Sequence, residues 1–286
     1  MTLNFKLYDF RLFCIFAPKC NFSMLFQIKS YIKFLWNSKN EHGVHSPFVF
    51  NLLTKCFYDK KPKPEYAILK NYRKSLLDNK NFIEVTDFGA GSKVFKSNRR
   101  QIAKIAQTAG ISTRRAELLF RITQYFRPAA ILEIGTSLGL ATSALALGNI
   151  DAKVITLEGC PETANQGQLQ LEKFNLKNVN SVVTEFEKYF KDIQKELKTD
   201  TDKFDLIYFD GNHSKKATLA YFEILLPTIT NDTVWIFDDI HWSLDMEEAW
   251  EAIKNHSKVT VTIDTFQWGF VFFRYEQEKE HFVIRV

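Results

Sequence analysis

Short apolar runs alternate with amphipathic stretches through the second half of the chain. Each run has the length of a buried strand, and each following stretch has apolar residues at helical spacing. The expected strands are 129–135, 153–159, 180–184, 204–210 and 233–239. The helices expected to follow them are 140–149, 161–174, 187–197, 215–226 and 244–256. This alternation predicts an α/β fold with a mostly parallel sheet covered by helices on both faces.

Two further strands are expected at the end of the chain, over 258–264 and 268–275. The link between them, TFQ, is too short for the crossover that parallel neighbours need. We therefore expect these two strands to be antiparallel.

The pattern before residue 110 is helical and irregular. Ser46 is suited to cap a helix that has Pro47 at its first position. The helices expected in this region and leading out of it are 24–36, 45–57, 64–80 and 114–126. We expect an N-terminal helical extension over 1–110 that closes over the site as a lid, and an α/β domain over 111–286.

The helix expected at 24–36 has an apolar face and lysines opposite it. A packing helix is the ordinary interpretation, and contact with a membrane surface is the alternative. Because Met24 opens this pattern, we expect translation to begin there rather than at Met1. No apolar run approaches the roughly 20 residues of a spanning helix, and no signal-peptide pattern is present. These features predict a cytoplasmic protein.

Composition narrows the class of partner. Hydrophobic residues make up 45% of the 286 residues and charged residues 25%, as in ordinary soluble proteins. The net charge of +5 is spread along the chain, so nucleic acid is not expected as a partner. The four cysteines have no metal-type spacing, which favours reduced thiols. A homodimer is an open alternative.

The first expected strand of the α/β domain ends in the sequence LEIGTSLGLAT. Gly135 and Gly139 allow a sharp turn and a close backbone approach to a ligand, and Glu133 places a carboxylate under the loop. The loop lacks the G-x-G-x-x-G pattern of dinucleotide sites. A ligand with a cationic part fits the carboxylate better. The next strand ends at Glu158, where a carboxylate can accept both ribose hydroxyls of an adenosine-type ligand.

The stretch VTDFGAGSKVF (85–95) also resembles an acidic–glycine loop. No buried strand precedes it, and basic residues follow it instead of an apolar helix. We assign it to the N-terminal region as a turn or as a lid over the site.

Acidic residues stand at the ends of two later strands, Asp210 in one and Asp238 with Asp239 in the other. These strands are expected to be neighbours, and sites rich in carboxylate oxygens suit divalent cations such as Mg²⁺. The alternative is that the carboxylates cap helices or accept backbone hydrogen bonds. His213 and His241 follow the two acidic ends and are candidates for the general base, or for loop histidines bonded to backbone.

Several of these motifs together resemble those of class I S-adenosylmethionine-dependent methyltransferases, closest to the catechol and sugar O-methyltransferase-like branch. The resemblance lies in LEIGTSLGLAT, Glu158, FDLIYFDGNH and WIFDDIH, and it covers about residues 112–275. The phrase EHGVHSPFVF (41–50) is similar to the opening of a group of bacterial methyltransferase-like proteins with no assigned substrate.

The resemblance implies a Rossmann-like sheet of seven strands with one reversed strand. It also implies that S-adenosylmethionine is bound by the strand ends. The residues implied in cofactor binding are Glu133, Gly135, Thr136, Ser137 and Gly139 around the methionine part, Glu158 at the ribose, Thr184, Glu185 and Phe186 near the adenine, and Asp210 beside the methyl group. The three aspartates Asp210, Asp238 and Asp239 would bind a divalent metal that positions two substrate oxygens.

The expected function is O-methyl transfer to the hydroxyl of a small molecule, with Asp210, His213 and His241 as candidate catalytic residues. A noncatalytic binding module and a nicotinamide-dependent oxidoreductase are the alternatives. Nucleic-acid methyltransferases often carry an Asn/Asp-Pro-Pro-aromatic motif after the fourth strand, where this chain has Asp-Gly-Asn-His.

Overall fold

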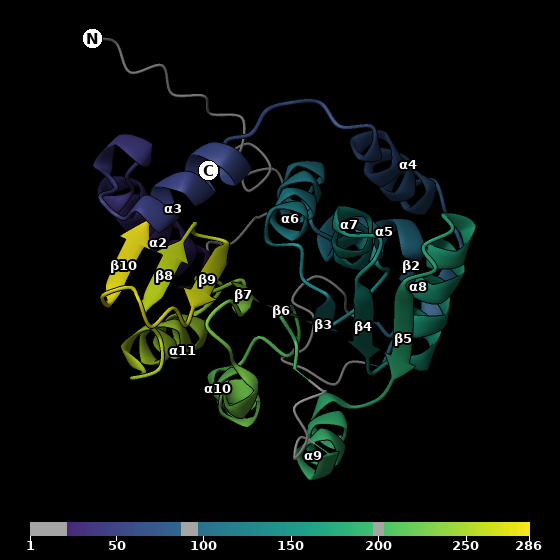
Figure 1. Cartoon of the computed structure of the whole chain (residues 1–286). Helices are drawn as coiled ribbons and strands as arrows, with labels where there is room; N and C mark the ends of the chain where they lie inside the picture. The colour runs from purple at the N-terminus through teal and green to yellow at the C-terminus, as the bar shows by residue number, and fades with distance from the viewer. Residues whose placement is uncertain (1–21, 87–96, 197–202) are drawn as a thin grey trace.

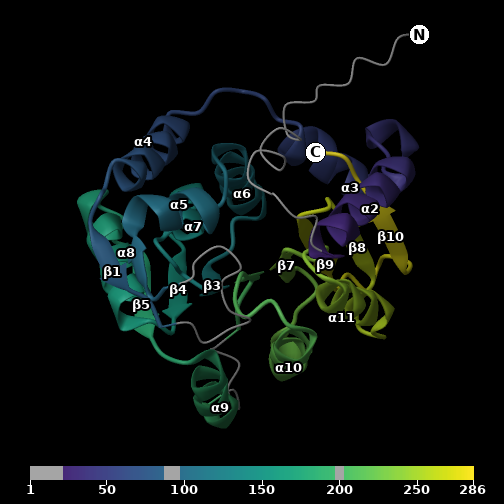
Figure 2. The same ribbon diagram turned by 180° about the vertical axis from the view of Figure 1, so that it is seen from behind.

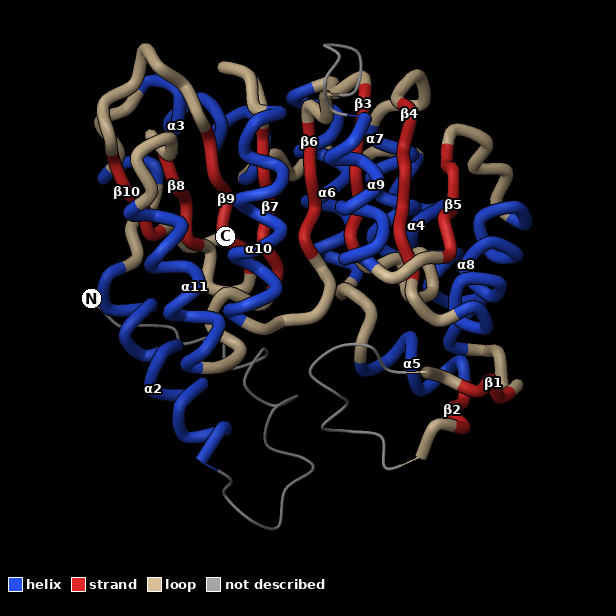
Figure 3. Tube along the Cα trace, turned by 90° about the horizontal axis from the view of Figure 1, so that it is seen from below, coloured by secondary structure: helices blue, strands red, loops and turns tan. Residues whose placement is uncertain are grey.

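The computed structural model describes residues 22–86, 97–196 and 203–286. Its main sheet has eight strands, drawn in Figure 1 and seen side by side in Figure 3. The strands are β3 (Ala130–Ile134), β4 (Lys153–Glu158), β5 (Val179–Val183), β6 (Leu206–Phe209), β7 (Val234–Asp238), β8 (Val261–Asp264), β9 (Trp268–Phe272) and β10 (Glu280–Val283). Their spatial order is β10-β8-β9-β7-β6-β3-β4-β5.

The direction of the strands follows the expected scheme. Strands β3 to β7 are parallel to their neighbours in that group, and β9 lies antiparallel between β7 and β8. The expected antiparallel pairing of the last two predicted strands is therefore confirmed. The expectation of seven strands is corrected to eight, because β10 pairs in parallel with the outer side of β8. This strand has a single buried residue, Phe282, and so carries no long apolar run that would mark it in the sequence.

Helices cover both faces of the sheet (Figure 1). One face is covered by α6 (Thr113–Phe126), α7 (Leu140–Gly148) and α8 (Pro161–Lys173), and the other by α9 (Phe186–Glu196), α10 (Lys215–Leu225) and α11 (Leu244–Asn255). Successive strand residues enter different cores: Leu206 packs in one apolar cluster and Ile207 in the other. The sheet is thus buried on both sides, which explains why its strands read as continuous apolar runs.

The N-terminal region adds helices and a short strand pair. Its elements are α2 (Phe22–Asn37), the 3₁₀ turn Glu41–Gly43, α3 (Pro47–Leu52), which continues as a π-helical turn over Leu53–Phe57, α4 (Glu65–Leu77), the antiparallel strands β1 (Phe82–Glu84) and β2 (Arg99–Gln101), and α5 (Ile102–Thr108). A second 3₁₀ turn, Leu226–Thr228, follows α10. Ser46 accepts a hydrogen bond from the amide of Val49 and has Pro47 after it, as expected for a cap.

Helix α2 packs against the turn between β8 and β9. The rings of Tyr31 and Phe34 lie 4.8 and 5.5 Å from that of Phe266. The outward face of the helix leaves three large apolar side chains exposed, Leu25, Ile32 and Trp36. Within the described part of the chain, no helix is long and apolar enough to cross a bilayer.

Some expectations fall on residues outside the described ranges. The proposed start at Met24 concerns the segment before it, and most of the 85–95 loop lies in the gap over 87–96. Cys14 and Cys20 are likewise outside. The two described cysteines, Cys56 and Cys160, are buried free thiols.

Candidate active site

The sequence-predicted residues gather at one edge of the sheet. Because β3 to β7 run parallel, the loops that follow them all leave from the same edge. The strand order turns back at β3, which pairs with β4 on one side and β6 on the other. Such a switch point is where open α/β sheets bind ligands. Figure 3 shows α2 and the group formed by α5, β1 and β2 beyond opposite ends of this edge.

The loop after β3 lies tightly against its neighbours. Gly135 has φ +103°, and a Cβ there would lie 2.2 Å from the carbonyl oxygen of Asp210. Gly139 has φ +76°, and a Cβ there would lie 2.4 Å from the hydroxyl of Tyr72. Glycine is therefore required at both positions for the turn and for the close packing of the loop.

Left-handed backbone is concentrated at the same edge. Four residues other than glycine have positive φ here: Ser137 (49°), Asn212 (65°), His213 (23°) and Asp239 (54°). Residues of this kind pay a conformational cost of about 1–3 kcal/mol each and cluster at functional sites. The strain agrees with the placement of the candidate residues.

Glu133 is fully buried beneath the glycine loop. Its Oε2 accepts hydrogen bonds from the hydroxyls of Thr156, at 2.6 Å, and Thr142. Burial raises the pKa of this carboxyl to about 8, although the two threonine hydrogen bonds oppose the change. Its Oε1 has no hydrogen-bond partner among the described residues. Glu133 thus supports the loop from below and leaves one oxygen unpaired.

Glu158 ties the end of β4 to the glycine loop. Its Oε2 accepts a hydrogen bond from the amide of Ser137 at 2.8 Å, and its Oε1 accepts one from the amide of Cys160 at 2.9 Å. The side chain is therefore held in a fixed position at the edge of the sheet.

The turn after β5 reaches the same edge. The amide of Thr184 donates to the carbonyl of Glu158 at 2.9 Å. Phe186, at the start of α9, lies over Gly211, where a Cβ would come within 2.5 Å of its ring. Glu185 is exposed. These three residues are thus positioned at one end of the candidate cofactor site.

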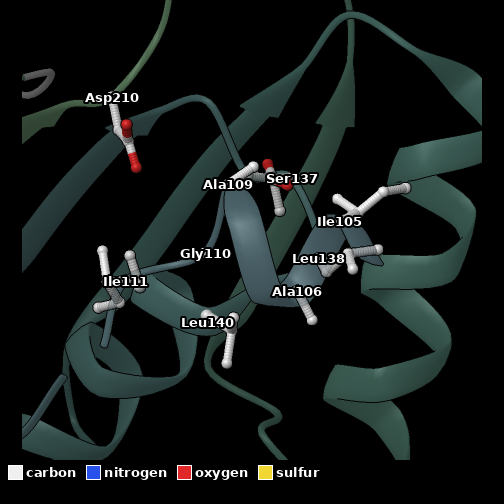
Figure 4. A pocket seen from close by; sticks show the side chains of 11 residues that line it. Ile105, Ala106, Ala109, Gly110, Ile111, Ser137, Leu138, Leu140 and Asp210 are labelled. Carbon is white, nitrogen blue, oxygen red and sulfur yellow. The ribbon is translucent and has the colours of Figure 1, made fainter. Parts of the chain in front are cut away.

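Residues of the N-terminal region contact the glycine loop. A small pocket there is lined by Ile105, Ala106, Ala109, Gly110 and Ile111 from α5 and the segment after it, by Thr136, Ser137, Leu138, Leu140 and Ala141 from the loop and α7, and by Asp210 (Figure 4). Tyr72 of α4 donates a hydrogen bond to the carbonyl of Leu138 at 2.9 Å. No motif in the sequence marked the α5 residues as part of the site.

Two aspartates face each other where β6 and β7 end. Nε2 of His213 lies 3.4 Å from Oδ1 of Asp210. Burial raises the pKa of Asp210 well above its usual value, and the charge of Asp238 raises it further. Burial alone lowers the pKa of His213, but Asp210, Asp239 and Asp238 outweigh it and raise the value to about 9. The two groups are therefore a close pair in which the imidazole lowers the pKa of Asp210 and the carboxyl raises that of His213.

Arg115 is a member of the site that the sequence did not reveal. From the first turn of α6, its Nη2 pairs with Oδ1 of Asp238, and its guanidinium lies 4.7 Å from the centre of the Trp268 ring. Burial lowers its pKa, but the charges of Asp238, Asp239 and Asp210 raise it overall. In the sequence Arg115 belongs to an ordinary amphipathic helix, far from the acidic strand ends, so no local spacing connects it with them.

The expected metal site stays a prediction. Within residues 22–86, 97–196 and 203–286, no three histidine, cysteine or acidic side chains are arranged to hold a metal ion. The prediction placed Asp210, Asp238 and Asp239 around a cation. In the structure the guanidinium of Arg115 pairs with Oδ1 of Asp238.

The two candidate bases are separated. Nε2 of His241 lies 2.8 Å from Oδ2 of Asp264, and its ring stacks on Phe266 at 5.3 Å between centres. His241 therefore belongs to the contact region that receives α2, whereas His213 is paired with Asp210. Of the histidines that the structure describes, only His213 lies against the acidic end of β6.

Comparisons with known proteins agree with this architecture. Residues 132–240 match the family described as a methyltransferase domain. No curated protein matches the sequence.

Solved structures with the same fold include three methyltransferases. An O-methyltransferase from Bacillus cereus in complex with S-adenosylhomocysteine is 19% identical, with TM-score 0.51 over 75% of this chain and 92% of that one. A Podospora anserina methyltransferase with bound S-adenosylhomocysteine is 14% identical, with TM-score 0.54 over 81% of this chain and 97% of that one. An O-methyltransferase of Streptomyces achromogenes with S-adenosylmethionine is 14% identical, with TM-score 0.51 over 82% and 99%. At these identities the likeness concerns the fold.

The family match runs from within β3 to just after β7, and it includes the glycine loop, Glu158, Asp210, Asp238 and Asp239. The chain thus contains a segment that matches a methyltransferase domain, and its fold is that of solved methyltransferases.

Proposed function

We propose that the protein transfers the methyl group of S-adenosylmethionine to a hydroxyl oxygen of a small molecule. The observation that carries the proposal is the placement of the Asp210–His213 pair directly against the glycine loop, where Gly135 touches the carbonyl of Asp210. Solved O-methyltransferases of the same fold support oxygen as the acceptor atom.

The proposed cofactor site follows the order of the strand ends. The loop from Gly135 to Gly139, with Thr136 and Ser137, surrounds the methionine part, and Glu133 supports it from below. The carboxylate of Glu158 accepts the ribose hydroxyls. Glu185 and Phe186 lie near the adenine. When bound, the cofactor supplies an electrophilic methyl group on a positively charged sulfur.

The remaining tasks belong to the protein's own residues. The sulfur leaves as a neutral group, so the protein must align the acceptor and remove its proton. We assign the removal of the acceptor's hydroxyl proton to the Asp210 carboxylate, because its raised pKa makes it a stronger base. The imidazole of His213 lies 3.4 Å from this carboxyl, opposes the rise of its pKa and fixes its direction.

The N-terminal extension, residues 1–110, is proposed to close the pocket and to select the acceptor. Its α4 and α5 contact the glycine loop, and Arg73 of α4 donates to the carbonyl of Ile111 at 2.6 Å. On the other side of the site, the view from behind shows α2 beside β8, β9 and α11 (Figure 2). An acceptor would have to fit between these two groups of elements.

The ribose assignment is tested by Glu158→Gln, with S-adenosylmethionine binding measured by calorimetry. Hydrogen bonds to a charged partner contribute about 1.5–3 kcal/mol, so the dissociation constant should rise roughly tenfold to hundredfold. The matched control is Glu162→Gln, an exposed residue on α8 that should bind normally. Equal binding by Glu158→Gln and the control would contradict the assignment, and preference for a nicotinamide cofactor in competition would contradict the proposed function.

A further inference from the structure

We propose that the guanidinium of Arg115 is the resident cation of the acceptor site, so that this chain needs no divalent metal for methyl transfer. The inference rests on the proposed O-methyl transfer and assigns the source of positive charge within that site. It replaces the metal that the acidic strand ends led us to expect.

The site requires a positive charge. Asp238 is buried, with 7% of its side chain exposed, and faces Asp210, which has 19% exposed. Crowded carboxylates are costly in such a place unless a cation pairs with them. Asp239 adds a third negative charge, which acts on Arg115 and His213. Among the described residues, Arg115 pairs with Asp238, and His213 lies 3.4 Å from Asp210.

The guanidinium is held from three elements. Ser112 caps α6 by accepting a hydrogen bond from the amide of Arg115 at 3.3 Å, which sets the direction of the first helical turn. Asp238 of β7 pairs with the guanidinium, and Trp268 of β9 presents its ring face to it. A planar guanidinium suits this combination of a carboxylate and an aromatic face better than a lysine does.

A metal ion and Arg115 compete for the same oxygen. Mg²⁺ and Mn²⁺ need carboxylate oxygens directed at one point. Oδ1 of Asp238 is engaged by Nη2 of Arg115, and a second cation beside the guanidinium would be repelled. One geometry explains both why the carboxylates tolerate each other and why they do not assemble as a metal site.

Arg115 also has capacity for a further role. Its Nε has no hydrogen-bond partner among the described residues, although the atom is buried. Guanidinium N–H groups can stabilise an oxygen that becomes negative as it loses its proton. In this role Arg115 supplies by hydrogen bonding the charge stabilisation that a metal supplies by coordination.

The test measures Mn²⁺ binding to the full chain by electron paramagnetic resonance, without acceptor. We compare wild type, Arg115→Met, Asp238→Asn, the double variant Arg115→Met with Asp238→Asn, and the control Arg114→Met, an exposed neighbour on the same helix. We expect no saturable binding to wild type or Arg114→Met at millimolar Mn²⁺. Arg115→Met should bind at least tenfold more tightly, and Asp238→Asn should abolish that gain.

Two results would overturn the inference. One is stoichiometric Mn²⁺ binding by wild type that Asp238→Asn removes, a comparison that does not depend on the folding of Arg115→Met. The other is a folded Arg115→Met that gains no Mn²⁺ affinity. S-adenosylmethionine binding by the same samples is measured separately. Its absence would contradict the proposed function and leave the Mn²⁺ result to decide the role of Arg115.

Discussion

At the scale of single residues, the site contains charged groups whose environment differs from water. Glu133 is the clearest case, because it is fully buried and receives two threonine hydrogen bonds on one oxygen. Burial disfavours its charged form and raises its pKa to about 8 from 4.5. The folded protein therefore binds this proton more tightly than the unfolded chain does.

The raised pKa of Glu133 makes the stability of the folded protein depend on pH. Because the folded state holds more protons between pH 4.5 and 8, the contribution of Glu133 to the free energy of unfolding falls as pH rises through that window. We predict that Glu133→Gln loses this part of the pH dependence, which is on the order of a few kcal/mol. Urea unfolding at pH 5, 7 and 9 would measure it, with Glu162→Gln as the exposed control. A parallel pH profile for Glu133→Gln and wild type would contradict the prediction.

Residue identity at the strand ends was readable from the sequence, but the pairing of residues was not. Glu158 and Asp210 were predicted at the sheet edge because each follows an apolar run, and the structure places them there. Arg115 was missed because its partner, Asp238, lies on a different element, far along the chain. His241 follows Asp239 closely in sequence, yet the chain turns it toward Asp264.

At the scale of elements, the loop after β3 is the least tolerant part of the site. A Cβ at Gly135 would meet backbone, the carbonyl of Asp210, rather than a side chain that can move. The positive φ adds strain for any residue other than glycine. The turn is therefore determined by the close approach of the two strand ends.

We predict that Gly135→Ala lowers both stability and S-adenosylmethionine affinity. The backbone contact and the strained φ should together cost at least about 1–3 kcal/mol. Gly43→Ala is the matched control, because its Cβ would meet only the flexible side chain of Lys39, at 3.0 Å. Thermal unfolding and calorimetry measure the two effects. Equal melting temperatures and affinities for the two variants would show that the loop can relax.

The elements that the sequence did not predict share a physical property. β10, β1 and β2 are short strands at edges, with few buried residues, so they give no periodic signal. α5 has only seven residues, of which four are buried, and its Ile105 and Ala106 line the pocket at the site. By contrast, the helices and strands with a long apolar face were predicted to within a few residues, because burial itself produces the pattern.

At the scale of the whole molecule, the candidate site lies at one edge of the sheet, and the N-terminal region partly covers that edge. The strand order turns back at β3, the position at which open α/β sheets bind ligands. α4 and α5 contact the glycine loop there, and α2 packs at the far end beside Phe266. The assignment of residues 1–110 as a lid is a proposal about this arrangement.

The central claim is that this edge binds S-adenosylmethionine with the charge of Arg115 in place of a metal. The most direct measurement is calorimetric titration of the full chain with S-adenosylmethionine in the presence of a chelator. The account predicts saturable binding of one cofactor per chain, with an affinity that added Mg²⁺ does not change. A folded protein that binds no cofactor, or binds it only after Mg²⁺ is restored, would contradict the account.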